Sequence, residues 1–101
     1  MTRITTHILD TVSGGPAPGI AVTLFVDVGG GWREVASAVT DEDGRVASLP
    51  EIGAGRGRLR FDSGTPFFPE VLVTFVVEEG RAQLHVPLIL SPYGYSVYRG
   101  S

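Results

Sequence analysis

Short runs in which apolar and polar residues alternate, each followed by a turn rich in glycine or proline, most constrain what this chain can fold into. Between Ile20 and Val28 every second residue is aliphatic, which predicts a strand with one buried face. The residues expected on that face are Ile20, Val22, Leu24, Val26 and Val28. The 14 glycines and 7 prolines of the 101 residues lie between such runs. This spacing predicts an all-β domain with many turns.

Both histidines of the chain fall within predicted strands. The segment from Ile4 to Asp10 alternates, and it places His7 on the face opposite its isoleucines. From periodicity alone, the simpler interpretation of His7 is a histidine on a half-exposed strand face. His85 lies in the predicted strand from Arg81 to Leu90, opposite its apolar residues. Pro87 in that segment cannot donate to a β-ladder, so we expect it at an edge or a bulge.

The last third of the chain contains two more predicted strands. Val71 to Glu78 is apolar on both faces, as expected for a strand that is covered on both sides or lies near an interface. Pro92 separates the histidine-containing strand from a final strand, Tyr93 to Arg99. Earlier in the chain, Val46 to Leu49 is expected to form a short strand.

Composition limits the classes of function. Hydrophobic residues make up 43% of the chain and charged residues 19%, which predicts one packed domain over residues 1–101. The net charge of −3 gives no basis for binding nucleic acid. Without cysteine there is no disulfide or thiolate metal site, and two histidines argue against structural zinc. No run is long enough to span a membrane and the start shows no apolar signal core, so we expect a cytoplasmic protein.

Two charged segments have simple structural interpretations. Arg56, Arg58 and Arg60 alternate along one predicted strand, and three arginines fit a solvated face of an edge strand better than a nucleic-acid footprint. The segment from Thr40 to Arg45 reads as an acidic turn ended by glycine. It has the beginning of a calcium loop but lacks the downstream ligands, including a glutamate at the twelfth position. Trp32, at a strand start, is expected to anchor a sheet edge.

The end of the chain is unusually rich in polar function. After Ser91-Pro92 come three tyrosines, and the sequence closes on Tyr98-Arg99-Gly100-Ser101. We expect Ser101 to carry the α-carboxylate. A phenol, a guanidinium, a flexible glycine and a carboxylate are a dense polar group for a region that usually frays. This tail is therefore predicted to be ordered and to face a ligand or a partner.

The ending resembles the C-terminal signature of the transthyretin-like family, in its branch of 5-hydroxyisourate hydrolases. The matching residues are His85-Val86-Pro87-Leu88, Ser91-Pro92-Tyr93, Tyr95-Ser96 and Tyr98-Arg99-Gly100-Ser101. The hormone-carrier branch shares the central Leu-Ser-Pro-Tyr-x-Tyr-Ser and lacks the closing Tyr-Arg-Gly-Ser. Further matches are Thr6-His7-Ile8-Leu9-Asp10, the loop Gly14 to Gly19, and Thr40 with Asp43-Gly44-Arg45. Together they extend over nearly the whole chain.

The resemblance implies a two-sheet antiparallel β-sandwich of about eight strands that assembles as a homotetramer with active sites between subunits. Members of the family usually carry a short helix before a Phe-Phe-Pro-Glu motif. Here only Ser63 to Pro66 separates Asp62 from that motif, so we expect the helix to be absent, in a natural variant or an engineered truncation. A monomer would hold the implied site on the open face of one sheet, which is a poor pocket.

The implied activity is hydrolysis of 5-hydroxyisourate to 2-oxo-4-hydroxy-4-carboxy-5-ureidoimidazoline in urate degradation, without metal or other cofactor. The catalytic residues it implies are His7, Arg45, His85 and Ser101, and those for substrate binding are His7, Arg45 and Tyr98. An imidazole titrates near neutral pH and can serve as base or proton shuttle, and a guanidinium is a fork of donors for a developing oxyanion. Which histidine is the base stays open at this point.

Two other classes of function fit the predicted fold. A non-catalytic small-ligand carrier of the same family needs neither the pair of histidines nor the Tyr-Arg-Gly-Ser ending. A structural or adhesion β-sandwich gives no reason for the tail. The joint presence of His7, Arg45, His85 and the ending favours the hydrolase.

Overall fold

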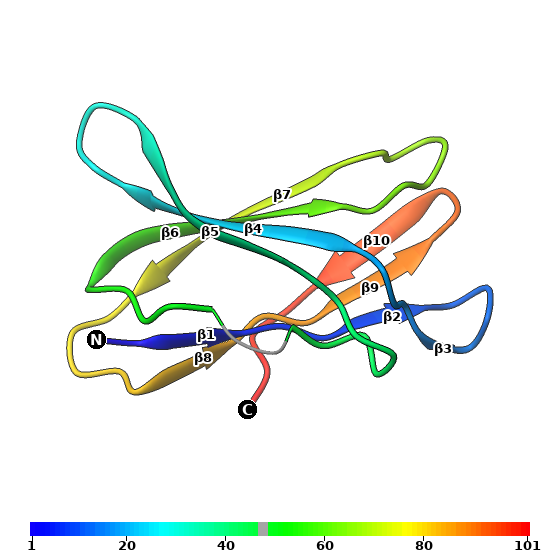
Figure 1. Cartoon of the computed structure of the whole chain (residues 1–101), viewed down its shortest axis with the longest axis horizontal. Coiled ribbons are helices and arrows are strands. Elements are labelled where there is room, and N and C mark those ends of the chain that lie inside the picture. The colour runs from blue at the N-terminus through cyan, green and yellow to red at the C-terminus, as the bar shows by residue number, and fades with distance from the viewer. Residues whose placement is uncertain (47–48) are drawn as a thin grey trace.

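Two four-stranded sheets pack against each other in the computed structural model, which describes residues 1–46 and 49–101 (Figure 1). One sheet has the order β5-β4-β6-β7, and its neighbouring strands are all antiparallel. The strands of this sheet are β4 (Ala21–Asp27), β5 (Trp32–Val39), β6 (Gly55–Asp62) and β7 (Val71–Val77). The predicted all-β sandwich is confirmed.

The second sheet has the order β10-β9-β2-β3. Its strands are β2 (Ile8–Asp10), β3 (Gly15–Pro16), β9 (Leu88–Ser91) and β10 (Gly94–Val97). A separate pair, β1 (Arg3–Thr5) with β8 (Gln83–His85), lies beside it at the lower left of Figure 1. The described residues form ten strands against the expected eight: two predicted strands are each divided in two, β3 was not predicted, and none of the ten is the predicted strand Val46 to Leu49.

Two of the predicted strands are each interrupted once. The segment from Ile4 to Asp10 becomes β1 and β2, and the segment from Arg81 to Leu90 becomes β8 and β9. Thr5 pairs with His85 and Ile8 with Leu88, so the register is the same on both sides of the break. At the break the Thr6 hydroxyl donates to the Val86 carbonyl at 2.6 Å, and Pro87 has no amide hydrogen to give.

These two ladders are parallel, within a sandwich whose other paired strands are antiparallel as expected. A parallel pair requires a long crossover between its strands, and here almost the whole chain lies between them. Alternation along one strand predicts which face is buried and says nothing about the direction of its partner. The parallel pairs bring the first ten residues beside the histidine-containing strand near the end of the chain.

The core lies between the sheets and draws on both. Its fully buried large side chains are Phe61, Ile4, Ile8, Leu24, Leu59, Leu88, Val22, Val71 and Val77. Val22 and Leu24 confirm the predicted face of β4, whereas Val28 is 57% exposed because the strand ends at Asp27. Leu72 and Val76 of β7 are exposed opposite the core, so one copy of the chain does not cover this strand on both sides, and the alternative that it lies near an interface stays a prediction.

The arginine stripe lies on β6, in the middle of its sheet, and not on an edge strand as expected. The Arg58 guanidinium stacks 4.0 Å from the centre of the Trp32 ring, and Arg60 pairs with Asp62 at 3.6 Å. Edge strand β5 begins at Trp32, in agreement with its predicted role. Arg58 and Arg60 therefore cover the aromatic rings of Trp32 and Phe25 on this sheet.

The connection from Ser63 to Glu70 is held without a helix, as predicted. The hydroxyl groups of Ser63 and Thr65 both donate to the Phe68 carbonyl, at 2.5 and 2.6 Å. The Phe68 ring packs edge-on against Tyr95, with ring centres 5.2 Å apart.

No helix long and apolar enough to cross a membrane is found in the described residues. The predicted strand Val46 to Leu49 lies in part outside those residues.

Candidate active site

His7 lies at the break between β1 and β2, where the chain changes its pairing partner. It forms an isolated antiparallel bridge with Arg45, and the next amide, of Ile8, donates to the Gly44 carbonyl at 2.9 Å. On its other side the His7 carbonyl accepts from the Leu88 amide at 2.9 Å. The backbone of His7 is thus fixed between the strand that carries His85 and the turn that carries Arg45.

A tight turn positions Arg45. One carboxylate oxygen of Asp41 accepts from the amides of Asp43 and Arg45, at 2.9 and 3.0 Å. Gly44 adopts a φ of 73°, and a Cβ there would collide with the carbonyl oxygen of Ile8. The predicted acidic turn is confirmed, and its glycine allows the turn to lie against the first residue of β2. Arg45 is exposed, so its guanidinium is free to meet a ligand.

His85 ends β8 directly opposite Thr5 of β1. Its Nδ1 lies 2.9 Å from the Thr5 hydroxyl oxygen. On the opposite side of β8 from Thr5, the amide of Gly100 donates to the His85 carbonyl at 2.9 Å, in an isolated antiparallel bridge. The chain end is therefore ordered against the second histidine, as the sequence predicts.

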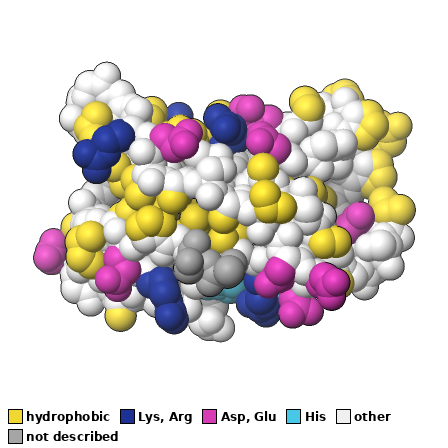
Figure 2. Space-filling view, viewed as in Figure 1, with side chains coloured by type: hydrophobic (Ala, Val, Ile, Leu, Met, Phe, Trp, Pro, Cys, Tyr) yellow, Lys and Arg dark blue, Asp and Glu magenta, His cyan; other side chains and the backbone are white. Residues whose placement is uncertain are grey.

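Burial and neighbouring charge both act on the pKa of His85. Burial is the main cause that lowers the pKa of His85 below its ordinary value of 6.5, and the charges of Arg45 and His7 lower it further. A hydrogen bond with the Thr5 backbone opposes this change in the pKa. His85 is thus kept neutral at neutral pH, which is the form that can accept a proton. In the space-filling view, histidine surface emerges at the lower rim of the molecule beside cationic side chains (Figure 2).

The structure does not bring every predicted site residue to this cluster. Tyr98 is 52% exposed and lines a hollow of about 210 Å³ together with Phe75, Leu84 and Val97. Leu84 faces the core side of β8, whereas His85 faces the other side. None of the described residues that line this hollow with Tyr98 is a histidine or Arg45. Ser101, one residue after Gly100, is exposed beside the cluster.

Sequence reasoning missed Thr5 as a residue of the site. Its alternation places it on the same face as His7, and this was visible in the sequence. Its contact with His85 depends on the parallel register between β1 and β8, which periodicity does not reveal.

Comparison with known proteins identifies the family. The model of the HIUase/transthyretin family matches residues 4–100. The chain belongs to this family.

Three relatives show how far the likeness extends. The chain is 42% identical to the 5-hydroxyisourate hydrolase of Salmonella dublin over 109 aligned residues, which cover 97% of the chain and 80% of the relative. The solved 5-hydroxyisourate hydrolase of Klebsiella pneumoniae is 33% identical with a TM-score of 0.85, over the full length of both chains. Sea bream transthyretin, solved in complex with thyroxine, is 31% identical with a TM-score of 0.88. The match covers 96% of this chain and 93% of the transthyretin chain.

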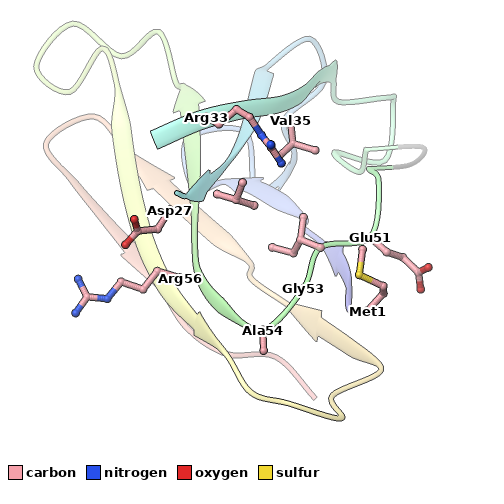
Figure 3. Close-up of a pocket in the computed structure, with 10 residues that line it drawn as sticks. Met1, Asp27, Arg33, Val35, Glu51, Gly53, Ala54 and Arg56 are labelled. Carbon is pink, nitrogen blue, oxygen red and sulfur yellow. The ribbon is translucent and has the colours of Figure 1, made fainter. Parts of the chain in front are cut away.

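Two further hollows on the molecule bring together fewer groups that could act on a substrate than the histidine cluster does. One of about 200 Å³ lies between the β4–β5 hairpin and the segment Glu51–Ala54 (Figure 3). There Arg33 turns inward toward Val35, whereas Asp27 and Arg56 point away. Another, of about 330 Å³, lies under the short connection at Ser63–Pro66. Within residues 1–46 and 49–101, no three His, Cys, Asp or Glu side chains are grouped as a metal site.

Proposed function

We propose that this chain hydrolyses 5-hydroxyisourate as a step of urate degradation. The observation that carries the proposal is the convergence of three separate segments on one point. His7 comes from the break after β1, Arg45 from an acidic turn, and His85 from β8, where the last residues of the chain also pair. The hydrolase relatives, at about 40% identity over nearly the full chain, support the same activity.

The cluster offers the groups that opening of a cyclic amide requires. A neutral imidazole takes a proton from water, and the water oxygen forms a bond to the ring carbonyl carbon. Negative charge then develops on the carbonyl oxygen, and the exposed Arg45 guanidinium is placed to donate to it. When the carbon–nitrogen bond breaks, the ring nitrogen takes up a proton and the carbonyl carbon becomes a carboxylate. Every step uses only water and side chains of the chain.

The remaining predicted residues take supporting roles in the proposal. Ser101 lies at the end of the segment that pairs with His85, and we assign it to orienting the water or the substrate. His7 shares the binding of the planar substrate with Arg45. Tyr98 is assigned to substrate binding on the family resemblance alone, because it lines a hollow that includes neither histidine nor Arg45.

We further propose that the chain works as a homotetramer. The cluster of a single copy is open to solvent, and a pocket around the substrate needs a second wall. Two of the edge strands carry exposed apolar side chains: Leu72 and Val76 on β7, and Tyr95 on β10. Light scattering on the purified protein tests the assembly, and Val76→Glu should shift it toward smaller species.

A non-catalytic carrier is the second candidate. The likeness to sea bream transthyretin, a structure that contains thyroxine, favours it, because the fold is shared to the same degree as with the hydrolase. A carrier needs no proton acceptor, and a neutral histidine beside an arginine and a second histidine has no use in it. The hydrolase therefore accounts for more of the chain.

A decay assay separates the two. 5-Hydroxyisourate generated freshly from urate is followed by absorbance, with and without the protein, and in the presence of a chelator. The hydrolase proposal predicts decay that accelerates in proportion to protein and survives chelation. Absence of acceleration by a folded tetramer would favour the carrier, and absence by a monomer would assign the loss to failed assembly.

A further inference from the structure

The Thr5 hydroxyl is the polar group that the structure places on the inner nitrogen of the His85 ring. Thr5 and His85 are paired residues of the parallel β1–β8 ladder, and Oγ1 lies 2.9 Å from Nδ1. The Thr5 carbonyl accepts from the Val86 amide at 2.9 Å, which fixes the backbone next to the ring. A hydrogen bond of this kind on one ring nitrogen determines the chemistry of the other.

The direction of this hydrogen bond depends on where the single hydroxyl hydrogen of Thr5 points. A threonine hydroxyl has one hydrogen to donate. Thr5 Oγ1 also lies 3.4 Å from the Leu84 carbonyl, which can only accept. With the hydroxyl hydrogen directed at Leu84, Oγ1 meets the ring with a lone pair, and Nδ1 must supply the hydrogen.

We propose that Thr5 is a positioning residue that holds neutral His85 with its hydrogen on Nδ1, so that Nε2 is the proton acceptor of the reaction. A neutral imidazole has one N–H, and a hydrogen on Nδ1 leaves the lone pair on Nε2. This inference rests on the proposed hydrolysis, and it assigns the general base to His85 and not to His7. The charged groups that face the ring are His7 and Arg45, and both favour its neutral form.

The opposite edge of the ring is held by the end of the chain. A Cβ on Gly100 would lie 2.5 Å from Cδ2 of His85, so the glycine backbone rests against that edge. Cδ2 is bonded to Nε2. The ring is therefore held at Nδ1 by Thr5 and beside Nε2 by the tail, which keeps Nε2 directed to one place.

Nitrogen NMR of the intact protein tests the tautomer without reference to activity. At about pH 8 the ring is neutral, and long-range nitrogen–proton spectra distinguish a protonated ring nitrogen from a bare one. For His85 we expect a protonated Nδ1 and a bare Nε2. The reverse pattern in the wild-type protein would overturn the inference, whether or not the protein hydrolyses 5-hydroxyisourate.

Variants at Thr5 test the consequence. Thr5→Val removes the hydroxyl and keeps a β-branched side chain suited to a strand. We expect kcat to fall by about 10- to 100-fold with KM within about twofold, and the His85 spectrum to show the Nε2–H form. Thr5→Ser, which keeps the hydroxyl, should restore both the tautomer and most of kcat.

Thr11→Val is the matched control, because the Thr11 hydroxyl also donates to a carbonyl across the parallel ladder, that of Leu90, away from the cluster. It should leave kcat and the His85 spectrum unchanged. Wild-type kcat in Thr5→Val would contradict the inference. If Thr5→Val fails to fold, the wild-type spectrum and Thr5→Ser still decide. Absence of activity in the wild-type protein would count against the hydrolase proposal. The nitrogen NMR spectrum would still report the tautomer of His85.

Discussion

Gly100 lies against the imidazole of His85, with its amide donating to the His85 carbonyl at 2.9 Å and room for no side chain between them. The ideal Cβ position is 2.5 Å from Cδ2 and 3.2 Å from Cγ of the ring. Those distances are well below van der Waals contact. The glycine of the Tyr-Arg-Gly-Ser ending is thus required by packing on a histidine and not by an unusual φ angle.

Gly100→Ala should therefore displace the His85 ring or the tail. We expect kcat/KM to fall by about 10-fold or more, since small misplacements of reacting groups are costly. The melting temperature should change little, because the tail contributes few core contacts. Gly30→Ala is a suitable control, since Gly30 lies in a hairpin turn with open space around its Cβ position. Equal activity of the two variants would remove Gly100 from the site.

The pH profile of kcat/KM should reflect the lowered pKa of His85. A base must be unprotonated to work, so activity is lost as pH falls through the pKa of the free enzyme. Burial first, and the Arg45 and His7 charges next, hold that pKa below 6.5. We expect the acid limb of the profile to have its midpoint below 6.5. A midpoint above that value would show that a different group is the base.

Removing the Arg45 charge should move the pKa of His85 back upward. A nearby positive charge disfavours the imidazolium, so Arg45→Gln makes protonation easier. Part of the change in pKa should persist because burial, its larger cause, is unaffected. Titration of the His85 ring protons by NMR measures this directly. Arg33→Gln, on a different sheet, should leave the pKa of His85 unchanged.

The turn that positions Arg45 depends on Gly44. Alanine there suffers both the positive φ of 73° and a collision with the Ile8 carbonyl oxygen. We expect Gly44→Ala to lower the free energy of unfolding by about 2 to 4 kcal/mol, measured by urea denaturation. Gly14 has nearly the same φ, 75°, but open space at its Cβ position, so Gly14→Ala should cost only about 1 kcal/mol. Similar losses in the two variants would mean that the contact with Ile8 is unimportant.

Much of the fold was accessible from periodicity, because burial imposes it residue by residue. Val22 and Leu24 lie in the core because every second side chain of a strand faces the same way. The same reasoning did not reveal the break at Thr6–His7. At that break the Thr6 hydroxyl donates a hydrogen bond to the Val86 carbonyl. Val86 is distant in sequence, so the alternation around Thr6 does not reveal this contact.

The candidate site was predicted by motif and not by spacing. The resemblance selected His7, Arg45 and His85, and the structure places them close enough for their charges to interact. Thr5 and the packing role of Gly100 were not predicted, because each depends on register or on contact between distant segments. The prediction that the arginine stripe lies on an edge strand was wrong for a related reason, because alternation does not encode strand order. The stripe lies on β6, a central strand.

In the proposed reaction, one cluster of His7, Arg45 and His85 hydrolyses 5-hydroxyisourate. Its most direct test is the decay rate of freshly generated 5-hydroxyisourate with the wild-type protein and with His7→Asn, Arg45→Gln and His85→Asn, each first shown to assemble like the wild type. We predict acceleration by the wild type and a loss of about 100-fold or more in each variant. Full activity in both histidine variants would contradict the account.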